Sequence, residues 1–333
     1  MPSFALSAHA SVFASIPSPS ISFIELGPLR IHFYALCIIA GIIVATIMTN
    51  HRLTKRGAEP WVVLDVTLPA IVLGIIFARI YHVLTHPDFY FGEGRNPLAV
   101  FYIWEGGIAI YGALIGGAIG AWLGCRWSGI RFWTYADALA PGILLAQAMG
   151  RFGNWFNQEL FGLPTDLPWG LEIDPDNFAF PVGLAPDTLF HPTFLYEVIW
   201  NVAGVFVLLW AGRSVAMQWG RLFGLYLLWY SAGRIVWESI RIDPSEIILG
   251  LRTNVWAAIF GVLVGLAIIV IQRRRHTGIE PSPYLPGRAP ASAEPGSAAG
   301  VQSQDTTEFV DVSEPPANEL ESGATATSTV ATK

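Results

Sequence analysis

Seven long apolar runs dominate this sequence, and each is close to the length that a helix needs to cross a membrane. They span residues 31–50, 61–84, 101–124, 132–150, 193–212, 220–240 and 254–272. A spanning helix needs about 20 mostly apolar residues, because the hydrocarbon core of a bilayer is about 30 Å thick. A soluble core accounts for one or two such runs, but not for seven. The sequence therefore predicts an all-α polytopic membrane protein with seven transmembrane helices.

The composition supports the same class of protein. The chain is 53% hydrophobic and only 13% charged, whereas soluble domains carry roughly 25% charged residues. It lacks the basic stripe of a nucleic-acid binder, so we expect no nucleic-acid partner. Cys37 and Cys125 both lie inside apolar runs, and we interpret them as inert, buried side chains. The two cysteines show no metal-ligand spacing, and we expect no metal site.

Lys and Arg in the loops predict the orientation, because cytoplasmic loops carry an excess of both. Basic residues gather in 51–60, 125–131, 212–221 and 273–275, and these regions alternate correctly along the chain. The segment 151–192 has one Arg against six carboxylates. The N-terminus is therefore expected outside the cytoplasm and the C-terminus inside.

The same patterns divide the chain into three parts. Residues 1–30 lack the basic start of a signal peptide and are interpreted as an extracytoplasmic extension. Residues 31–275 form the seven-helix transmembrane domain, with a larger extracytoplasmic segment at 151–192. Residues 276–333 are rich in Ala, Pro, Ser, Thr and Glu, which is typical of a disordered cytoplasmic tail.

Polar side chains crowd together in GRFGNWFNQELFG, at the outer end of the fourth run. Ionisable groups inside a membrane are costly, which makes them functional candidates. Arg151, Asn154 and Asn157 recur at i, i+3 and i+6 and share a face if the helix persists. An arginine fork suits phosphate, and asparagine both donates and accepts. Glu159 can accept a hydroxyl or orient Arg151. The alternative is a polar helix cap, which needs only one or two such residues.

Further candidates lie near the outer ends of other runs. Arg234, Glu238 and Arg241 in the sixth run share one helical face. Glu238 can pair with Arg234, and the remaining positive charge would suit a bound anion; an ion pair that only fixes packing is the alternative. Arg79 either snorkels, braces another helix or binds ligand. Tyr34 is either an interfacial aromatic or part of the site. Together these groups suit an anionic lipid head group reached from the outer leaflet.

These residues resemble the bacterial prolipoprotein diacylglyceryl transferase family. GRFGNWFNQELFG (150–162) is similar to the signature G-R-x-G-N-[F/W]-x-N-x-E-x-[F/W]-G at every fixed position. HPTFLYE (191–197) resembles H-P-[S/T]-x-L-Y-E, and GRIVWESIR (233–241) resembles R-x-x-x-E-x-x-R. The resemblance covers about 30–275. Three shorter matches follow in the family's order: HFYA (32–35), FARIY (77–81) and WEGGIAIYGALIGG (104–117).

The resemblance implies a multi-pass transferase of the bacterial plasma (inner) membrane that acts in lipoprotein biosynthesis. Such an enzyme moves the diacylglyceryl group of phosphatidylglycerol onto the thiol of the lipobox cysteine of a preprolipoprotein. A thioether forms and glycerol 1-phosphate is released. The implied partners are phosphatidylglycerol, lipobox peptides and the lipid bilayer, and no cofactor is implied.

The resemblance also assigns roles to the candidates. The leading pair for stabilising the phosphate leaving group is Arg151 and Arg234, because preorganised donors in a dry site stabilise developing charge. The catalytic candidates are Arg151, Arg234, Glu159, Asn154 and Tyr111. The candidates for binding phosphatidylglycerol are Arg151, Asn154, Asn157, Tyr34, Glu238, Arg241 and Arg79.

Tyr111 departs from the family pattern, because many members carry His at that position. With a reference pKa of about 10, tyrosine is a poor general base at neutral pH. Either the base lies elsewhere, or this position mainly orients the head group through a hydrogen bond. A third hypothesis is that nearby arginines lower the pKa of the substrate thiol enough that no strong base is needed.

Two rival functions use the same arginines. An anionic lipid or solute transporter or flippase needs polar residues along the full depth of the membrane, whereas the inner halves of these runs are nearly free of charge. A non-catalytic scaffold that binds lipid or lipoproteins differs from an enzyme only in an activity assay.

Overall fold

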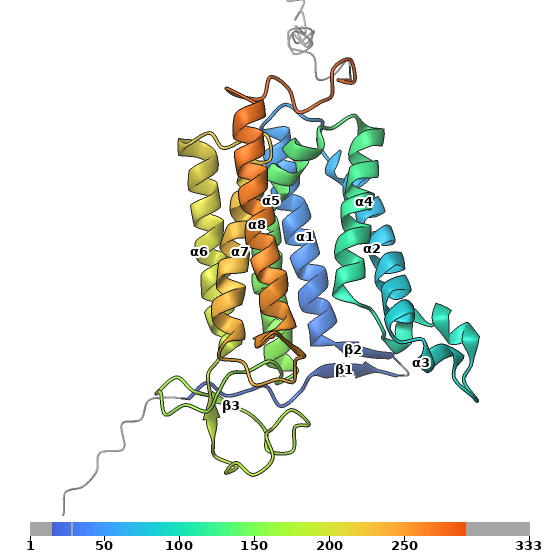
Figure 1. Cartoon of the computed structure of the whole chain (residues 1–333), viewed down its shortest axis with the longest axis vertical. Helices are drawn as coiled ribbons and strands as arrows, with labels where there is room; N and C mark the ends of the chain where they lie inside the picture. Colours follow the sequence, from blue (N-terminus) through green and yellow to red (C-terminus); the bar gives the residue numbers. More distant parts are fainter. Residues whose placement is uncertain (1–14, 28, 291–333) are drawn as a thin grey trace, which may run out of the picture. The chain divides into compact units, whose positions relative to one another are not determined.

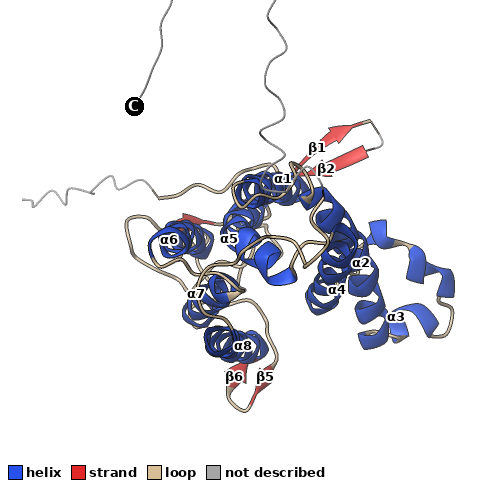
Figure 2. Cartoon of the chain, turned by 90° about the horizontal axis from the view of Figure 1, so that it is seen from above, coloured by secondary structure: helices blue, strands red, loops and turns tan. Residues whose placement is uncertain are grey.

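The computed structural model describes residues 15–27 and 29–290, and this part of the chain is mostly helical (Figure 1). Its long helices are α1 (Phe33–Thr54), α2 (Val63–Thr85), α4 (Ile110–Ser128), α5 (Phe132–Phe156), α6 (Thr193–Ser214), α7 (Arg221–Glu238) and α8 (Thr253–Arg275). Seen end-on, α1 and α5 lie between the α2–α4 pair and α6 (Figure 2).

Short elements connect these helices. Three antiparallel hairpins pair β1 (Phe23–Leu26) with β2 (Leu29–His32), β3 (Leu171–Glu172) with β4 (Leu189–Phe190), and β5 (Ile247–Ile248) with β6 (Leu251–Arg252). The connection between α2 and α4 contains α3 (Asp88–Phe91) and the 3-10 turns η1 (Pro97–Phe101) and η2 (Ile103–Glu105).

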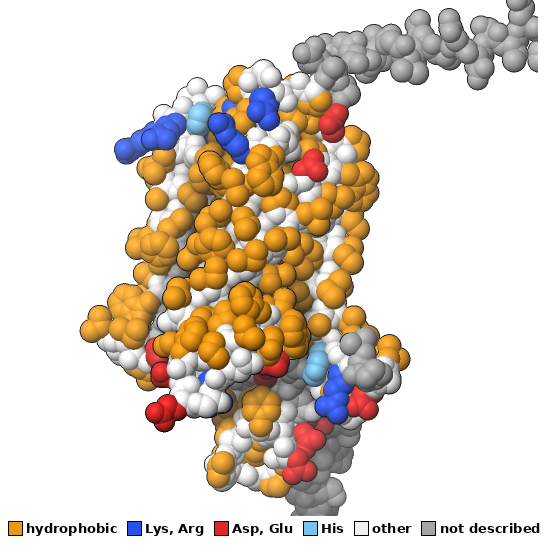
Figure 3. Space-filling model, turned by 90° about the vertical axis from the view of Figure 1, so that its right-hand side faces the viewer, with side chains coloured by type: hydrophobic (Ala, Val, Ile, Leu, Met, Phe, Trp, Pro, Cys, Tyr) orange, Lys and Arg blue, Asp and Glu red, His pale blue; other side chains and the backbone are white. Residues whose placement is uncertain are grey.

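The sides of the bundle are apolar. Within the described part of the chain, α1, α2, α6 and α8 are long and apolar enough to cross a membrane. A band of hydrophobic side chains separates charged side chains at the two ends (Figure 3). Isoleucines on α1 and leucines on α2 are among the exposed residues, and a soluble monomer rarely exposes so large an apolar surface. These features are those of a helical membrane protein.

Glycines at every fourth position of α4 place this helix directly against α2. A Cβ atom added at Gly112, Gly116 or Gly120 would collide with backbone carbonyl oxygens of α2, at Phe77, Leu73 and Pro69 respectively. Small residues at this spacing allow close helix packing without a hydrophobic driving force. The contact fixes where the first residues of α4, including Tyr111, lie relative to the rest of the bundle.

Most helix ends fall within a few residues of the predicted runs, with two exceptions. The third run was predicted to begin at 101, but α4 begins at Ile110. The side chain of Asn96 caps a 3-10 turn, and Gly106 and Gly107 then take positive φ angles of 90° and 72°, which end regular structure. The fourth run continues beyond 150, because α5 extends to Phe156 and carries the polar motif on its last turns.

The expected tail at 276–333 does not begin where the composition suggests. Residues 276–290 lie against the end of the bundle, and Tyr284 is only 2% exposed. Its hydroxyl accepts a hydrogen bond from the Glu59 backbone N–H at 2.8 Å, and Arg131 donates to the Tyr284 carbonyl at 2.8 Å. The interpretation as one disordered tail is therefore wrong for these residues; 291–333 lie outside the described part of the chain.

Candidate functional site

A cavity of about 400 Å³ lies between helices at the end of the bundle where α1 and α8 begin. We call it the arginine cavity, because Arg151 of α5 and Arg234 of α7 both line it. Three further predicted residues line the same cavity: Tyr34 of α1, Tyr111 of α4 and Asn154 of α5. Five candidates that were chosen from four separate runs are therefore brought together.

The last turns of α5 explain how the motif GRFGNWFNQELFG reaches the cavity. Because the helix persists, Arg151 and Asn154 lie one turn apart on one face. A Cβ atom at Gly153 would come within 3.1 Å of the Tyr34 Cα atom, so this glycine permits α1 and Tyr34 to pack against α5. The backbone then turns sharply, with positive φ angles at Gln158 and Leu160.

The sharp turn folds Glu159 back onto the helix end. Its carboxylate accepts hydrogen bonds from Asn154 Nδ2 at 2.8 Å and from Asn157 Nδ2 at 3.3 Å. Asn154 Oδ1 in turn accepts a bond from Arg151 Nη1 at 3.3 Å. Glu159 was expected to accept a hydroxyl or to orient Arg151; the geometry links it to Arg151 through Asn154. Neither Glu159 nor Asn157 is among the residues that line the cavity.

The two cavity arginines share one buried carboxylate. Arg151 Nη2 lies 2.6 Å from Glu197 Oε2, and Arg234 Nη1 lies 3.9 Å from the same oxygen. The Glu197 side chain is 5% exposed, against 13% for Arg151 and 18% for Arg234. The guanidinium groups are therefore held in a largely dry site, while each still reaches the cavity. Glu197 lies in the HPTFLYE motif but was not among the predicted site residues.

Glu238 connects an arginine of the cavity to a second group of charged side chains. Its side chain is fully buried and pairs with Arg234 at 3.1 Å, Arg241 at 3.3 Å and Arg252 at 2.9 Å. The expected pairing of Arg234 with Glu238 is thus present. Asn254 Nδ2 donates to Oε1, the oxygen that also faces Arg252, at 2.9 Å. Glu238 holds Arg234 in position but does not itself line the cavity.

Arg241 is a buried partner within the network of ion pairs. Its Nε and Nη2 atoms donate to the two carboxylate oxygens of Asp243 at 2.6 and 2.8 Å. Burial lowers the pKa of Arg241, but the hydrogen bonds and charge of Asp243, together with the charges of Glu238 and Glu197, outweigh this effect, so the pKa is raised. Arg241 was expected to bind lipid directly, yet it is not among the residues that line the cavity.

Arg79 lies outside the arginine cavity. Its guanidinium donates to five backbone carbonyls, at Ala99, Val100, Tyr102, Gly106 and Gly107. It also lies over the Tyr90 ring, 5.0 Å from the centroid. The alternatives for Arg79 were snorkelling, bracing another helix or binding ligand; its hydrogen bonds instead brace the connection that leads into α4.

Three polar residues of the cavity were not predicted: Gln147, Tyr230 and Asn254. Gln147 precedes Arg151 by one helical turn, and Tyr230 precedes Arg234 by one turn, so the 3.6-residue period was a usable signal for both. Asn254 begins the last apolar run, where a polar residue at a helix start is ordinary. Only its contact with Glu238 shows that it belongs to the site.

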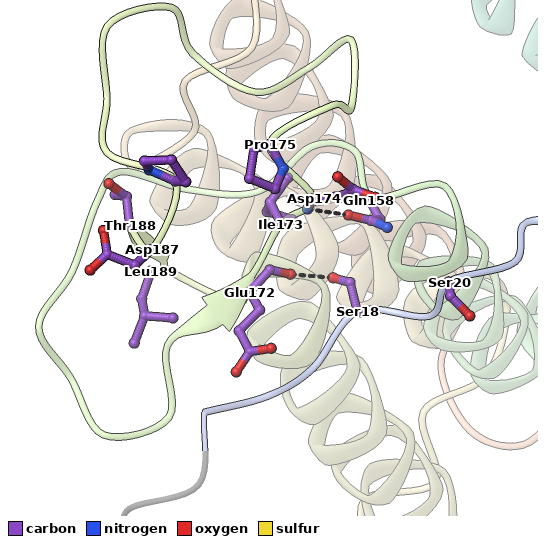
Figure 4. A pocket seen from close by; sticks show the side chains of 11 residues that line it. Ser18, Ser20, Gln158, Glu172, Ile173, Asp174, Pro175, Asp187, Thr188 and Leu189 are labelled. Atoms are coloured by element: carbon purple, nitrogen blue, oxygen red, sulfur yellow. Dashed lines mark hydrogen bonds between the residues drawn. The ribbon is translucent and has the colours of Figure 1, made fainter.

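A second cavity, of about 450 Å³, lies on the loop that follows α5 (Figure 4). It is lined by the acidic residues Glu172, Asp174 and Asp187, and by Ser18, whose hydroxyl donates to the Glu172 carbonyl at 2.5 Å. Carboxylates repel a phosphate, so this cavity does not suit the anionic ligand that the arginines favour.

Comparison with known proteins finds matches over most of the chain. The family model for prolipoprotein diacylglyceryl transferase matches residues 21–271. The phosphatidylglycerol–prolipoprotein diacylglyceryl transferase of Leifsonia xyli subsp. xyli is 60% identical over 290 residues, which are 84% of this chain and 87% of the relative. The protein of that name from Cutibacterium acnes is 49% identical over 80% of this chain and 90% of its own length. Transferase 2 of Streptomyces coelicolor is 45% identical over 88% and 95%.

Proposed function

Since this chain belongs to the prolipoprotein diacylglyceryl transferase family, we propose that its arginine cavity is where the diacylglyceryl group is transferred. The acceptor is the thiol of the lipobox cysteine of a preprolipoprotein. The thiol gives up its proton, a carbon–sulfur bond forms and the bond between the glycerol carbon and the phosphate oxygen of phosphatidylglycerol breaks. Glycerol 1-phosphate leaves with the electron pair of the broken bond, and the proton of the thiol balances the second negative charge on this product. The observation that carries this proposal is the convergence of Arg151 and Arg234, from two helices, on one cavity.

The arginines act on the leaving phosphate. Negative charge grows on its oxygens as the carbon–oxygen bond breaks, and preorganised donors in a site that excludes water stabilise such charge. Glu197 holds Arg151 at 2.6 Å and Glu238 holds Arg234 at 3.1 Å before substrate binds. These carboxylates reduce the reorganisation that binding requires. Asn154 and Glu159 are positioning residues in this scheme, because they act through Arg151.

Tyr34, Tyr111 and Tyr230 line the cavity as neutral hydrogen-bonding groups. A phenol hydroxyl can donate to a phosphate or glycerol oxygen, which is the role we assign to Tyr111. The nucleophile belongs to the substrate protein. Cys125 is buried, Cys37 faces an apolar pocket with Met149 and Phe152, and neither lines the arginine cavity.

A neighbouring groove suits the acyl chains of the lipid. It has a volume of about 430 Å³, lies between α1, α2 and α5, and is lined mostly by apolar side chains such as Ile38, Ile42 and Ile143. Gln147 and Gly150 line both this groove and the arginine cavity. A phospholipid with its phosphate at Arg151 therefore has an apolar surface immediately beside it.

The proposal includes the topology predicted from the sequence. All seven long helices cross the bacterial inner membrane, with the N-terminus outside and the C-terminus inside. The arginine cavity then opens at the outer leaflet, where a translocated preprolipoprotein and phosphatidylglycerol meet. The arrangement that supports this is the position of the 51–60 basic loop at the end of α1 opposite to Tyr34.

The test uses the full-length protein in phosphatidylglycerol vesicles with a synthetic lipobox peptide. We expect the peptide to gain the mass of a diacylglyceryl group while an equal amount of glycerol phosphate is released. Phosphatidylcholine vesicles and a peptide with serine in place of cysteine are the controls. Movement of phosphatidylglycerol between leaflets without peptide modification would favour a flippase, and the absence of both products from folded protein would refute the transferase.

A further inference from the structure

A pocket rich in basic residues lies at the end of the bundle opposite to the arginine cavity. Its volume is about 300 Å³, and its charged lining comes from the end of α1, with Arg52, Lys55 and Arg56, and from the end of α6, with Arg213. We call it the basic pocket. Arg52 follows Tyr34 by 18 positions along α1, which is about 27 Å at the rise of an α-helix. The basic pocket is therefore separate from the arginine cavity.

Two guanidinium nitrogens in this pocket are buried without a hydrogen-bond acceptor. Arg52 Nε and Arg56 Nη1 are both shielded from solvent, and neither finds a hydrogen-bond partner among the described residues. The only hydrogen bond of the Arg52 guanidinium in that part of the chain runs from Nη2 to the Asp137 carbonyl, at 3.2 Å. A buried charged donor without an acceptor is destabilising, because it has lost its hydration without gaining a partner. An anionic ligand would supply the acceptor that is lacking.

The carboxylates near this pocket are hydrogen-bonded to other groups, although Glu280 also forms a long ion pair with Arg56 Nη1. Both oxygens of Asp137 accept backbone N–H groups at the start of α7, from Gly220 and Phe223 at 2.8 Å each. Glu280 accepts from Thr134 and from the Trp219 backbone, and lies 3.7 Å from Arg56. No acidic side chain is among the described residues that line the pocket. Its four basic residues therefore outnumber the carboxylates around them.

The shape of the basic pocket also suits a ligand with an apolar part. Met48 and Leu209 complete its wall, and each precedes a pocket arginine by one helical turn, towards the middle of the bundle. Gly212 leaves space beside Arg52, because a Cβ atom there would lie 3.4 Å from Leu222 Cδ2 and 3.7 Å from Arg52 Nη2. Arginine forks recognise phosphate oxygens, and lysine adds charge. A charged opening beside apolar side chains is complementary to a glycerol phosphate that carries acyl chains.

We propose that the basic pocket binds the phosphate group of a net anionic ligand, supplied either by an anionic phospholipid of the adjoining leaflet or by a soluble phosphate. Such binding stabilises the end of the bundle that carries α1, α6 and residues 276–290. This binding is separate from the transfer reaction. It makes the stability of this end of the protein depend on an anionic phosphate group.

The experiment measures the unfolding temperature of the full-length protein in a neutral detergent, followed by tryptophan fluorescence. The probes are dioctanoyl phosphatidic acid, dioctanoyl phosphatidylcholine and sodium phosphate. The pocket variant is Lys55→Gln with Arg213→Gln, because both side chains are exposed and the substitutions leave the Arg52 contacts intact. The matched control is Arg274→Gln with Arg275→Gln, which removes the same charge from exposed positions at the same end.

We expect phosphatidic acid to raise the unfolding temperature of the wild type and the control equally, and to bind the pocket variant at least about tenfold more weakly. A shift that sodium phosphate reproduces with the same variant dependence identifies a soluble ligand. A shift seen only with phosphatidic acid identifies a lipid. Phosphatidylcholine, which has no net charge, should produce no variant-dependent shift.

A steric variant separates a built pocket from diffuse attraction. Gly212→Ala keeps every charge and places a methyl group against Arg52 at ordinary contact distance, so we expect it to fold normally and to bind phosphatidic acid more weakly. Equal binding by wild type, Lys55→Gln/Arg213→Gln and Gly212→Ala would overturn the proposal. Equal losses in the pocket variant and the Arg274→Gln/Arg275→Gln control would overturn it as well.

Discussion

Replacing Glu197 with glutamine tests whether the carboxylate prepares the two cavity arginines for the reaction. Glu197 is 4% exposed, and its Oε2 atom lies 2.6 Å from Arg151 and 3.9 Å from Arg234. Glutamine keeps the size and an acceptor oxygen but removes the charge. The close contact is an ion pair between largely buried side chains, and breaking such a pair by removing the charge of one partner is destabilising. Arg151 then loses its carboxylate partner, whereas Arg234 keeps Glu238. Without the charge of Glu197 the repulsion between the two arginines is no longer offset, so Arg151 moves from the position required in the transition state.

We expect Glu197→Gln to lower kcat by about 100-fold, the lower end of what the loss of one preorganised donor costs. KM for phosphatidylglycerol should stay constant or fall, because the substrate phosphate no longer competes with Glu197 for Arg151. Folding stability should fall by about 3 kcal/mol, the low end for breaking a buried pair, since the arginine side chains keep 13% and 18% exposure.

The assay follows release of glycerol phosphate at varied phosphatidylglycerol in mixed micelles, with the unfolding temperature recorded for each variant. Glu93→Gln is the matched control, because Glu93 is exposed on the connection between α2 and α4. A Glu197→Gln enzyme with kcat within twofold of wild type would refute the role in preorganisation. A raised KM at unchanged kcat would show instead that Glu197 contributes only to ground-state binding.

Three further outcomes follow from the same geometry. Arg151→Lys keeps the charge but loses the planar fork that contacts Glu197 and Asn154, so transfer activity should fall at least about 100-fold, as measured by peptide mass shift. Tyr111→Phe should keep activity within about tenfold of wild type in that assay, because the hydroxyl supplies one neutral hydrogen bond; complete loss would make Tyr111 essential. Gly116→Ala should lower the unfolding temperature and the yield of folded protein, since its Cβ would collide with the α2 backbone, whereas the matched Gly117→Ala has 3.8 Å of clearance and should behave as wild type.

The long apolar runs predicted the helices because membrane-spanning length is a strong constraint on a sequence. The ends of α1, α2 and α6 lie close to the predicted limits for this reason. The start of α4 was missed because 101–109 is as apolar as a helix yet contains Gly106 and Gly107 in backbone conformations that end regular structure. Hydropathy reflects only the side chains, whereas the backbone conformation of the two glycines determines where α4 begins.

Residues 276–290 show a different limit of composition. Their sequence is rich in Pro and Gly, and it contains few large apolar side chains. Tyr284 and Glu280 nevertheless anchor the segment through contacts with Glu59, Arg131, Thr134 and Trp219. These partners lie 61 to 225 positions away along the chain. No window on the sequence contains such contacts, so a local argument predicts a tail.

The residues of the candidate site were predictable where they recur at the helical period on one helix. They were less predictable where a carboxylate on one helix pairs with arginines on others. Arg151 and Asn154 follow the helical period, and so do Arg234 and Glu238. The partnership of Glu197 with both arginines joins α6 to α5 and α7. It could be inferred only from the cost of burying a lone charge, which requires a partner but does not name it.

The sum of these charges bears on why the site suits the proposed reaction. The ion pairs join four arginines, Arg151, Arg234, Arg241 and Arg252, to three carboxylates, Glu197, Glu238 and Asp243. One positive charge is left over, and Glu159 reaches it only through Asn154. A phosphodiester such as phosphatidylglycerol carries one negative charge and restores the balance. As the carbon–oxygen bond breaks, the phosphate gains a second charge, so its attraction to the fixed arginines grows along the reaction. Interactions that strengthen between ground state and transition state are those that accelerate a reaction. Neutralising one carboxylate, as in Glu197→Gln, leaves an additional positive charge in the free enzyme, so phosphatidylglycerol should bind as tightly as before or more tightly. The arginines are then less well positioned for the transition state, so the reaction should be slower.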